Sequence, residues 1–468
     1  MNEPMPARTS SISLRPSACP GLLRIVPALD GGICRIKLAG GSITAAQACV
    51  VADAAQRYAG GVIEATNRAN LQIRGVGADQ DGLIAILLDA GLGPSNPASD
   101  DVRNLMLSPT AGIDPQQLFD SRPLAAQILG TLESEPRFHD LSPKFALLLD
   151  GGEALAMLEH PHDLWLSARM IDGDVLMAFG LAGCPAEDAP LAAVPLSHAH
   201  ELVVAVLDAF LELARPEQVR MRHVLAEMST EAFLLVVAKR MTVEFCRRQR
   251  VGEWLDTVCL THRLASKLAP TGGQLPSPVN RHLGIYPQDV AGLVSVGGAA
   301  PLGRLDASML RAVAKLAAEW GDGTLRLTPW QSLLLPNIHR DHAANVLTGL
   351  QAAGLICSPE QPLAHLIACT GSAGCGKGLA DTKADALLLA ARLEHLDLKL
   401  AVHLTGCSRS CAAAHVAPVT LLAVSAGHYD LYFRDAQQPG FGSLRARDLT
   451  IEAVGTLLAA DSRSSTDD

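Results

Sequence analysis

Residues 44–73 read TAAQACVVADAAQRYAGGVIEATNRANLQI, and residues 306–335 read DASMLRAVAKLAAEWGDGTLRLTPWQSLLL. The two stretches align without a gap at a constant offset of 262 residues. Each begins with a side chain that can cap a helix, Thr44 or Asp306, and continues with apolar residues at helical spacing. A glycine pair then ends each predicted helix. We therefore predict the same helix in both halves of the chain.

Strand-like runs surround each predicted helix. Runs at 34–38 and 293–296 precede the helices, and runs at 62–66 and 324–328 follow them. With the next run, which starts at Leu71 or Leu333, the unit is β-α-β-β, half of a ferredoxin-like sandwich. Pieces of this kind also resemble one another by chance. A gapless match with both caps and both glycine stops in register favours a duplication.

The repeat continues more weakly downstream. Residues 144–151 (KFALLLDG) resemble residues 399–406 (KLAVHLTG), and residues 103–112 loosely parallel residues 365–374. We therefore expect an α+β fold in which two half-domains and two α/β domains are related by a pseudo-twofold axis. Two halves that face each other in this way create a cleft between them, and we expect the chemistry there.

The predicted domain boundaries follow from this duplication and from composition. The ends lack apolar periodicity, and the linker is rich in Pro, Gly and Ser. The segments are a flexible N-terminus at 1–14, a first ferredoxin-like half-domain at 15–95, a first α/β domain at 96–268, a linker at 269–279, a second half-domain at 280–345, a second α/β domain at 346–461, and a flexible tail at 462–468.

Composition and charge exclude several classes of protein. The net charge is −10 over 468 residues and no Lys/Arg run stands out, which argues against a nucleic-acid partner. The first residues lack the basic start and apolar core of a signal peptide, and no apolar run reaches membrane-spanning length. We therefore expect a cytoplasmic protein with no membrane partner. In that reducing compartment its eleven cysteines are not expected to form a disulfide framework.

Four cysteines carry the clearest chemical signal. Cys369 and Cys375 flank a glycine-containing loop of five residues, and Cys407 and Cys411 are four apart, which places both sulfurs on one face if that run is helical. Four thiolates match the four irons of a [4Fe–4S] cluster. Structural zinc also takes four cysteines, usually in closer pairs. Buried free thiols are expected at Cys34, Cys49, Cys184, Cys246, Cys259 and Cys357.

These cysteine pairs, in the second of two ferredoxin-like repeats, resemble the siroheme-dependent sulfite and nitrite reductases, and the resemblance covers almost the whole chain. Residues 66–72 (TNRANLQ) are similar to the family's Thr-x-Arg-Gln-x-x-Gln signature. Residues 102–112 resemble its Arg-Asn signature, and residues 141–146 (LSPKFA) its Leu-Pro-Arg-Lys-Phe-Lys segment. The resemblance implies two sulfite-reductase-like α/β domains, and it implies that Arg68, Arg103 and Lys144 are catalytic cations that hold an anionic substrate.

The chain also departs from the reductase pattern. The family's fourth cation falls on Ala146, and Ser408 and Arg409 replace the usual Pro-Asn between the last cysteines. A lost cation weakens the electrostatic stabilisation that reduction of a small oxyanion needs. The opening at 15–22 (RPSACPGL) and the Ser-Pro-Lys-Phe segment look more like the precorrin-3B synthase branch. That branch implies a monooxygenase that hydroxylates precorrin-3A to precorrin-3B, with γ-lactone formation, in aerobic cobalamin biosynthesis.

On this interpretation the partners are precorrin-3A, dioxygen and an external electron carrier that uses reduced pyridine nucleotide. No Gly-x-Gly-x-x-Gly follows a predicted strand, so the chain is not expected to bind the nucleotide itself. Whether an additional iron is bound beside the cluster stays open. Two alternatives also stay open: a siroheme-dependent nitrite or sulfite reductase, and a non-catalytic iron–sulfur electron carrier.

In two pairs of histidines a single residue separates the two members: His160 and His162, and His198 and His200. Both pairs could bind a metal, but an exposed or capping role is the preferred interpretation.

Overall fold

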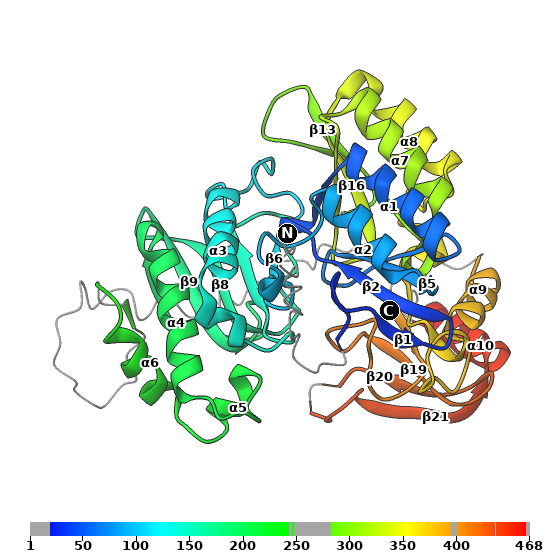
Figure 1. Ribbon diagram of the computed structural model, residues 1–468. Helices are drawn as coiled ribbons and strands as arrows, with labels where there is room; N and C mark the ends of the chain where they lie inside the picture. Colours follow the sequence, from blue (N-terminus) through cyan, green and yellow to red (C-terminus); the bar gives the residue numbers. More distant parts are fainter. Residues whose placement is uncertain (1–18, 243–245, 248–281, 395–399, 436, 465–468) are drawn as a thin grey trace, which may run out of the picture.

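The computed structural model describes residues 19–242, 246–247, 282–394, 400–435 and 437–464. The predicted N-terminal segment 1–14 and linker 269–279 lie outside these residues. The elements form four sheets (Figure 1). The last helix, α10, runs to Ser464 and so continues into the segment predicted as a tail.

The two half-domains contain the same elements at the predicted offset. The first has β1 (Val26–Ala28), β2 (Gly31–Ile36), β3 (Ser42–Thr44), α1 (Ala45–Tyr58), β4 (Val62–Ala65), β5 (Leu71–Val76) and α2 (Gln80–Asp89). The second has β12 (Gly284–Pro287), β13 (Leu293–Ala299), β14 (Arg304–Asp306), α7 (Ala307–Trp320), β15 (Thr324–Leu327), β16 (Ser332–His339) and α8 (Ala343–Ala352). The predicted caps are confirmed, since Thr44 accepts from Gln47 N–H and Asp306 from Met309 N–H.

The half-domains exchange a short strand. β3 leaves its own repeat and pairs with β15, placing Thr44 opposite Thr324. β14 does the reverse and pairs with β4, placing Asp306 opposite Val62. Neither of these two short strands was predicted from the sequence. Each sheet is therefore completed by its partner repeat, and the two half-domains form one unit.

Helices α1 and α7 pack against each other on the same side of these two sheets (Figure 1). Their buried faces belong to one apolar core that contains residues of both repeats, such as Val51 and Val313. Burial of apolar surface shared between the copies stabilises the pair as a whole. The duplicated ferredoxin-like fold is confirmed.

The two α/β domains also share a topology. The first contains β6 (Leu105–Leu107), α3 (Arg122–Ser134), β7 (Leu147–Asp150), β8 (His162–Ile171), β9 (Asp174–Gly183), β10 (Ala192–Pro195), α4 (Ala199–Leu213), α5 (Met221–Leu225), α6 (Thr230–Ala238) and β11 (Cys246–Arg247). The second contains β17 (Leu366–Ala368), α9 (Thr382–Arg392), β18 (Val402–Thr405), β19 (Val419–Ser425), β20 (His428–Phe433), β21 (Ser443–Thr450) and α10 (Ile451–Ser464). In each sheet three parallel strands are followed by antiparallel ones.

Across the described residues, none of the helices combines the length and the apolar character needed to span a bilayer.

Candidate functional site

The four cysteines lie on loops that follow two neighbouring parallel strands. Cys369 comes directly after β17, and Cys407 comes two residues after β18. Because parallel strands end at the same edge of a sheet, both loops start side by side. The backbone joins them: Gly406 N–H donates to Cys369 Sγ at 3.2 Å, and Cys369 N–H donates to the Leu404 carbonyl at 3.3 Å.

All four thiols share one electrostatic environment, which we call the cysteine site. Burial raises the pKa of Cys411, and Cys407, Cys369 and Cys375 each raise it further. The run from Cys407 is not helical, so the conditional expectation of a helical turn is wrong: the residues form turns, and Ser410 has a φ of 51°, which a right-handed helix does not allow. Cys375 and Cys411 are exposed.

This donor set fits a cluster better than a single metal ion. No group of three His, Cys, Asp or Glu side chains in the described ranges is placed to hold one ion. A zinc ion needs its ligands within about 2.3 Å, whereas the thiolates of a cluster each bind a separate iron. Backbone N–H donation to a cluster sulfur is also typical, and Gly406 already makes such a bond.

The cysteine site is built against the first half-domain. The carbonyl of Gly374 accepts from Leu29 N–H at 3.2 Å and from Arg74 Nη2 at 3.4 Å. A Cβ at Gly374 would lie 2.7 Å from Asp30 Oδ2, so a larger residue would force neighbouring side chains to move. The loop that carries Cys375 is therefore fixed by residues of the other repeat.

The loop that carries Arg68 touches the second cysteine pair. Asn67 Nδ2 donates to the carbonyls of Ala412 at 3.2 Å and Cys411 at 3.4 Å. The loop is held by the Thr66 hydroxyl, which accepts from Arg68 N–H at 3.3 Å. This contact holds the loop of Arg68, the first predicted catalytic residue, against the loop of the second cysteine pair.

Two further arginines gather around Arg68. Burial lowers the pKa of Arg68, and the charge of Arg220 lowers it further, while Asp163 opposes them. Burial and the charge of Arg68 lower the pKa of Arg35 to about 10. Arg220 Nε donates to Asp163 Oδ2 at 2.8 Å, and within the described part of the chain Arg68 has no side-chain partner. The result is a partly buried group of cations suited to an anion.

The other two predicted catalytic residues are placed differently. Arg103 is mostly buried and pairs with Glu133 at 3.6 Å and with Asp100 at 4.0 Å. Lys144 is exposed. Asn104 connects their motifs, since its Nδ2 donates to the carbonyls at 143 and 145. The structure therefore brings the loop of Arg68 to the cysteine site, holds Arg103 in ion pairs, and leaves Lys144 facing solvent.

Sequence reasoning missed several charged residues of the site. Lys37 is buried, and burial lowers its pKa to about 7, with Arg35 and Arg103 contributing. Lys383 lies near Cys369 and donates to the Ala368 carbonyl at 3.4 Å. Arg35 lies within an otherwise apolar strand, and a cation in such a position could have been recognised from the sequence as a candidate site residue. Arg220 gave no such signal.

The histidines differ from the prediction. His160 and His162 are both buried, with 3% and 4% of their surface exposed, so an exposed or capping role for this pair is wrong. The ring of His160 lies 5.1 Å from that of His415, which follows the cysteine loop. Burial is the main cause that lowers the pKa of His160 and of His162, and the charge of Arg68 lowers both further. Both histidines therefore belong to the neighbourhood of Arg68.

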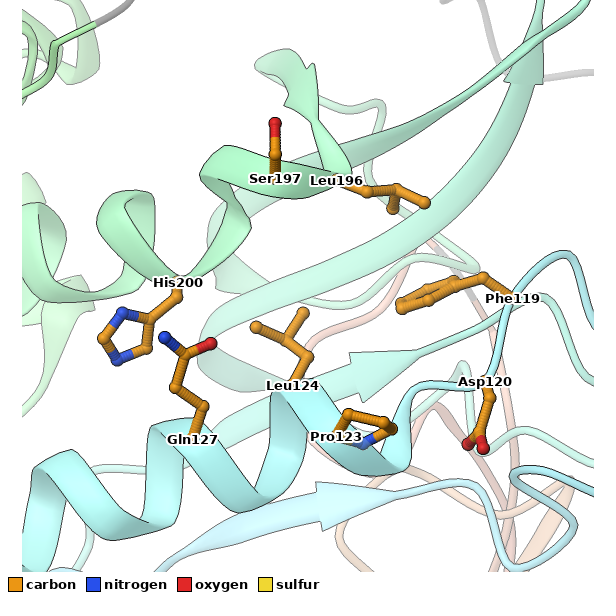
Figure 2. A pocket seen from close by; sticks show the side chains of 8 residues that line it. All are labelled: Phe119, Asp120, Pro123, Leu124, Gln127, Leu196, Ser197 and His200. Atoms are coloured by element: carbon orange, nitrogen blue, oxygen red, sulfur yellow. The ribbon is translucent and has the colours of Figure 1, made fainter.

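A separate pocket of about 370 Å³ lies between α3 and the start of α4 (Figure 2). Its lining side chains are Phe119, Asp120, Pro123, Leu124, Gln127, Leu196, Ser197 and His200. His200 Nε2 is already engaged with Thr131 Oγ1 at 2.8 Å. The pocket shares no residue with the cysteine site or the cations, and we assign it no role in the chemistry.

Comparisons with known families agree with this architecture. Residues 98–245 match the model of the nitrite and sulphite reductase 4Fe-4S domain. Residues 27–90 and 286–353 match the nitrite/sulfite reductase ferredoxin-like half domain, once in each repeat. The first match covers the first α/β domain, and the four cysteines lie outside it.

Individual relatives align over most of the chain. The chloroplastic ferredoxin–nitrite reductase of Zea mays is 32% identical over 411 residues, which cover 82% of this chain and 68% of that protein. Sulfite reductase [ferredoxin] 2 of Mycolicibacterium paratuberculosis is 27% identical over 410 residues, which cover 83% of this chain and 69% of that protein. The solved structure of Mycobacterium tuberculosis NirA protein superposes with a TM-score of 0.70 at 22% identity, covering 91% of this chain and 79% of that chain.

These relatives overturn the predicted monooxygenase. The proteins that this chain resembles are named as ferredoxin-dependent reductases of nitrite or sulfite, so the hydroxylation of precorrin-3A with dioxygen and reduced pyridine nucleotide is wrong. The structure supplies a physical reason. Ala146 lacks a charge, but its N–H binds Asp163 at 2.8 Å, and Asp163 holds Arg220 beside Arg68. The missing cation therefore does not leave the site without positive charge. The chain belongs to the nitrite and sulfite reductase family.

Proposed function

We propose that this chain reduces nitrite or sulfite by six electrons, using a [4Fe–4S] cluster held by Cys369, Cys375, Cys407 and Cys411 together with siroheme. The observation that carries the proposal is the contact of Asn67 with the carbonyls of Cys411 and Ala412. It joins the loop of an unpaired arginine to the loop of a cluster ligand. An anion held by Arg68 therefore lies next to the source of electrons.

The cysteines and cations have distinct roles in this proposal. The cluster, when bound, supplies electrons one at a time, and siroheme supplies the iron that binds the substrate. The chain contributes the charge. Arg68, Arg35 and Arg220 bind anionic oxygens in a partly desolvated site, where charge-assisted hydrogen bonds are strong. Buried Arg103 and exposed Lys144 are proposed to add to the positive field around the substrate.

Two buried polar groups without hydrogen bonds support a bound cofactor with acidic side chains. Among the described residues His403 Nε2 is buried and has no hydrogen-bond partner, and Arg103 Nη2 makes no hydrogen bond although Asp100 Oδ1 lies 4.0 Å away. An unsatisfied buried donor costs about 1–3 kcal/mol, so such groups are usually matched by a ligand. A carboxylate-bearing tetrapyrrole offers acceptors for them.

Electrons are proposed to arrive from a separate ferredoxin-type protein, as the names of the relatives indicate. Cys375 and Lys377 are exposed at the cysteine site, so a protein donor can approach the cluster there. Thiolate ligands and an oxygen-sensitive cluster suit the cytoplasm, where thiols stay reduced.

Anaerobically purified protein tests the proposal. Iron, acid-labile sulfide and extractable siroheme are measured per chain, and nitrite and sulfite are then offered separately with reduced methyl viologen. We expect a porphyrinoid absorption band and formation of ammonia or sulfide. Protein that carries both cofactors and reduces neither anion would refute the proposal. The relatives' names include both reductases, and the ratio of kcat/KM for the two anions identifies the preferred substrate.

A further inference from the structure

Four histidines meet between the two α/β domains, and we call them the histidine group. His160 and His162 come from the first domain, and His403 and His415 from the second. The rings of His160 and His415 are tilted by 43° with their centres 5.1 Å apart, a separation that a bridging water can span. None of the sequence motifs explains why they meet here.

The outer end of the histidine group reaches solvent. His415 Nε2 lies 3.5 Å from Glu159 Oε2, and their side chains are 20% and 36% exposed. Burial lowers the pKa of His415, Glu159 and Glu187 raise it, and Arg434 lowers it. Arg434 itself pairs with Glu187. A carboxylate in contact with both water and an imidazole can pass a proton inward.

The inner end lies near Arg68. Burial lowers the pKa of His160 well below its usual value, with His415, His162 and Arg68 contributing. His162 Nδ1 lies 2.8 Å from the His160 carbonyl, so it carries the proton and leaves Nε2 as an acceptor. Burial lowers the pKa of His162 to about 3, and Arg68 and Arg220 contribute. Neutral imidazoles can accept a proton on one nitrogen and release another from the second.

Two ring nitrogens of the histidine group lack protein partners. His415 Nδ1 and His403 Nε2 are both buried and unpaired among the described residues. The Nε2 atom of His415 faces Glu159, so its unpaired Nδ1 is the nitrogen from which a proton could leave toward the interior. The transfer leaves the charge of the imidazole ring unchanged, because the ring gains a proton at one nitrogen as it loses one at the other.

We propose that Glu159, His415 and His160 form a proton relay from solvent to the anion held at Arg68. The inference rests on the proposed function. Reduction of nitrite consumes six electrons and eight protons to give ammonium and two waters; reduction of sulfite consumes the same numbers to give hydrogen sulfide and three waters. The electrons come from the ferredoxin-type donor. The protons must cross protein, and the histidine group provides the route.

The test uses the holoenzyme and the variants Glu159→Gln and His415→Gln, with exposed His339→Gln as control. Each variant is first checked for unchanged iron and siroheme content. With nitrite or sulfite and reduced methyl viologen, we expect kcat to fall at least tenfold in His415→Gln while KM changes little. The solvent deuterium isotope effect should increase, because proton delivery becomes rate-limiting. A kcat within twofold of wild type would overturn the relay while leaving the proposed function intact.

A second measurement does not depend on turnover. Exchange of the imidazole C2 hydrogen, followed by mass spectrometry against pH, reports the pKa of each histidine. Because Glu159 raises the pKa of His415, Glu159→Gln should lower it and leave His339 unchanged. An unchanged His415 pKa would contradict the coupling. Wild-type holoenzyme inactive toward both anions would overturn the proposed function and, with it, the relay.

Discussion

The backbone N–H of Gly406 donates a hydrogen bond of 3.2 Å to Sγ of Cys369. It joins the loop that carries the first cysteine pair to the loop that carries the second. A Cβ at Gly406 would lie 3.0 Å from Gly378 Cα, so the two loops are in close backbone contact. The cysteine site is thus held by main-chain geometry as well as by its thiols.

Serine at Cys369, Cys375, Cys407 or Cys411 is expected to abolish the cluster, because each iron needs its own soft thiolate ligand. Iron and acid-labile sulfide are measured per chain after anaerobic purification. Cys49→Ser, on helix α1, serves as the matched control and should keep full content. Retention of full iron and sulfide in any of the four variants would show that the ligand set is misassigned.

Arg68→Gln is expected to raise KM for nitrite or sulfite by roughly tenfold or more, since a hydrogen bond to a charged group contributes about 1.5–3 kcal/mol. Steady-state kinetics with reduced methyl viologen measure the change. Lys315→Gln removes an exposed cation on α7, and its KM should stay at the wild-type value. Equal KM values for Arg68→Gln and wild type would remove Arg68 from the substrate site.

Glu64→Gln is expected to lower the free energy of unfolding by about 3 kcal/mol, because the buried charge of Lys383 then keeps only carbonyl acceptors, from Leu302 and Ala368. Glu64 is 11% exposed and lies 2.9 Å from Arg304, 3.7 Å from Lys383 and 3.8 Å from Arg74. Burial raises its pKa, but these three cations lower it more. Urea unfolding measures the loss, and Glu319→Gln on the exposed face of α7 is the control. Equal stability of both variants would contradict this role.

Acid sensitivity follows from the buried His162. Its pKa is about 3 in the folded chain, against an ordinary value of 6.5. Between these values the unfolded chain binds one proton more, so stability falls as the pH drops below about 6.5, by about 1.4 kcal/mol per pH unit. His162→Gln should show a weaker loss from pH 6.5 to 4.5 than wild type or His339→Gln. Identical pH dependence in all three would rule out His162 as the source.

Local patterns were sufficient to predict the duplicated half-domains. Thr44 and Asp306 cap their helices as expected, because capping depends on residues within one turn. The exchange of β3 and β14 could not be predicted, since Thr44 pairs with Thr324 of the other repeat and nothing near Thr44 specifies that partner. Pairing between distant edges is decided by tertiary packing.

The candidate site was predicted only in part. Arg68 was found through its motif, whereas Arg220 reaches the same place through Asp163, which lies 57 residues away in the sequence. Ala146 was interpreted as a lost cation, and that led to the wrong reaction. The charge is supplied from another element, and a linear motif cannot reveal such a replacement. The histidine group likewise depends on two domains that meet in space.

The most direct test of the central claim is the product stoichiometry of the anaerobically purified holoenzyme. Nitrite and sulfite are each supplied in limiting amount with excess reduced methyl viologen, and consumed electrons are compared with ammonia or sulfide formed. We expect six electrons per anion consumed, with no intermediate released, and loss of the reaction in Cys407→Ser. Cluster- and siroheme-loaded protein that forms neither product from either anion would contradict it.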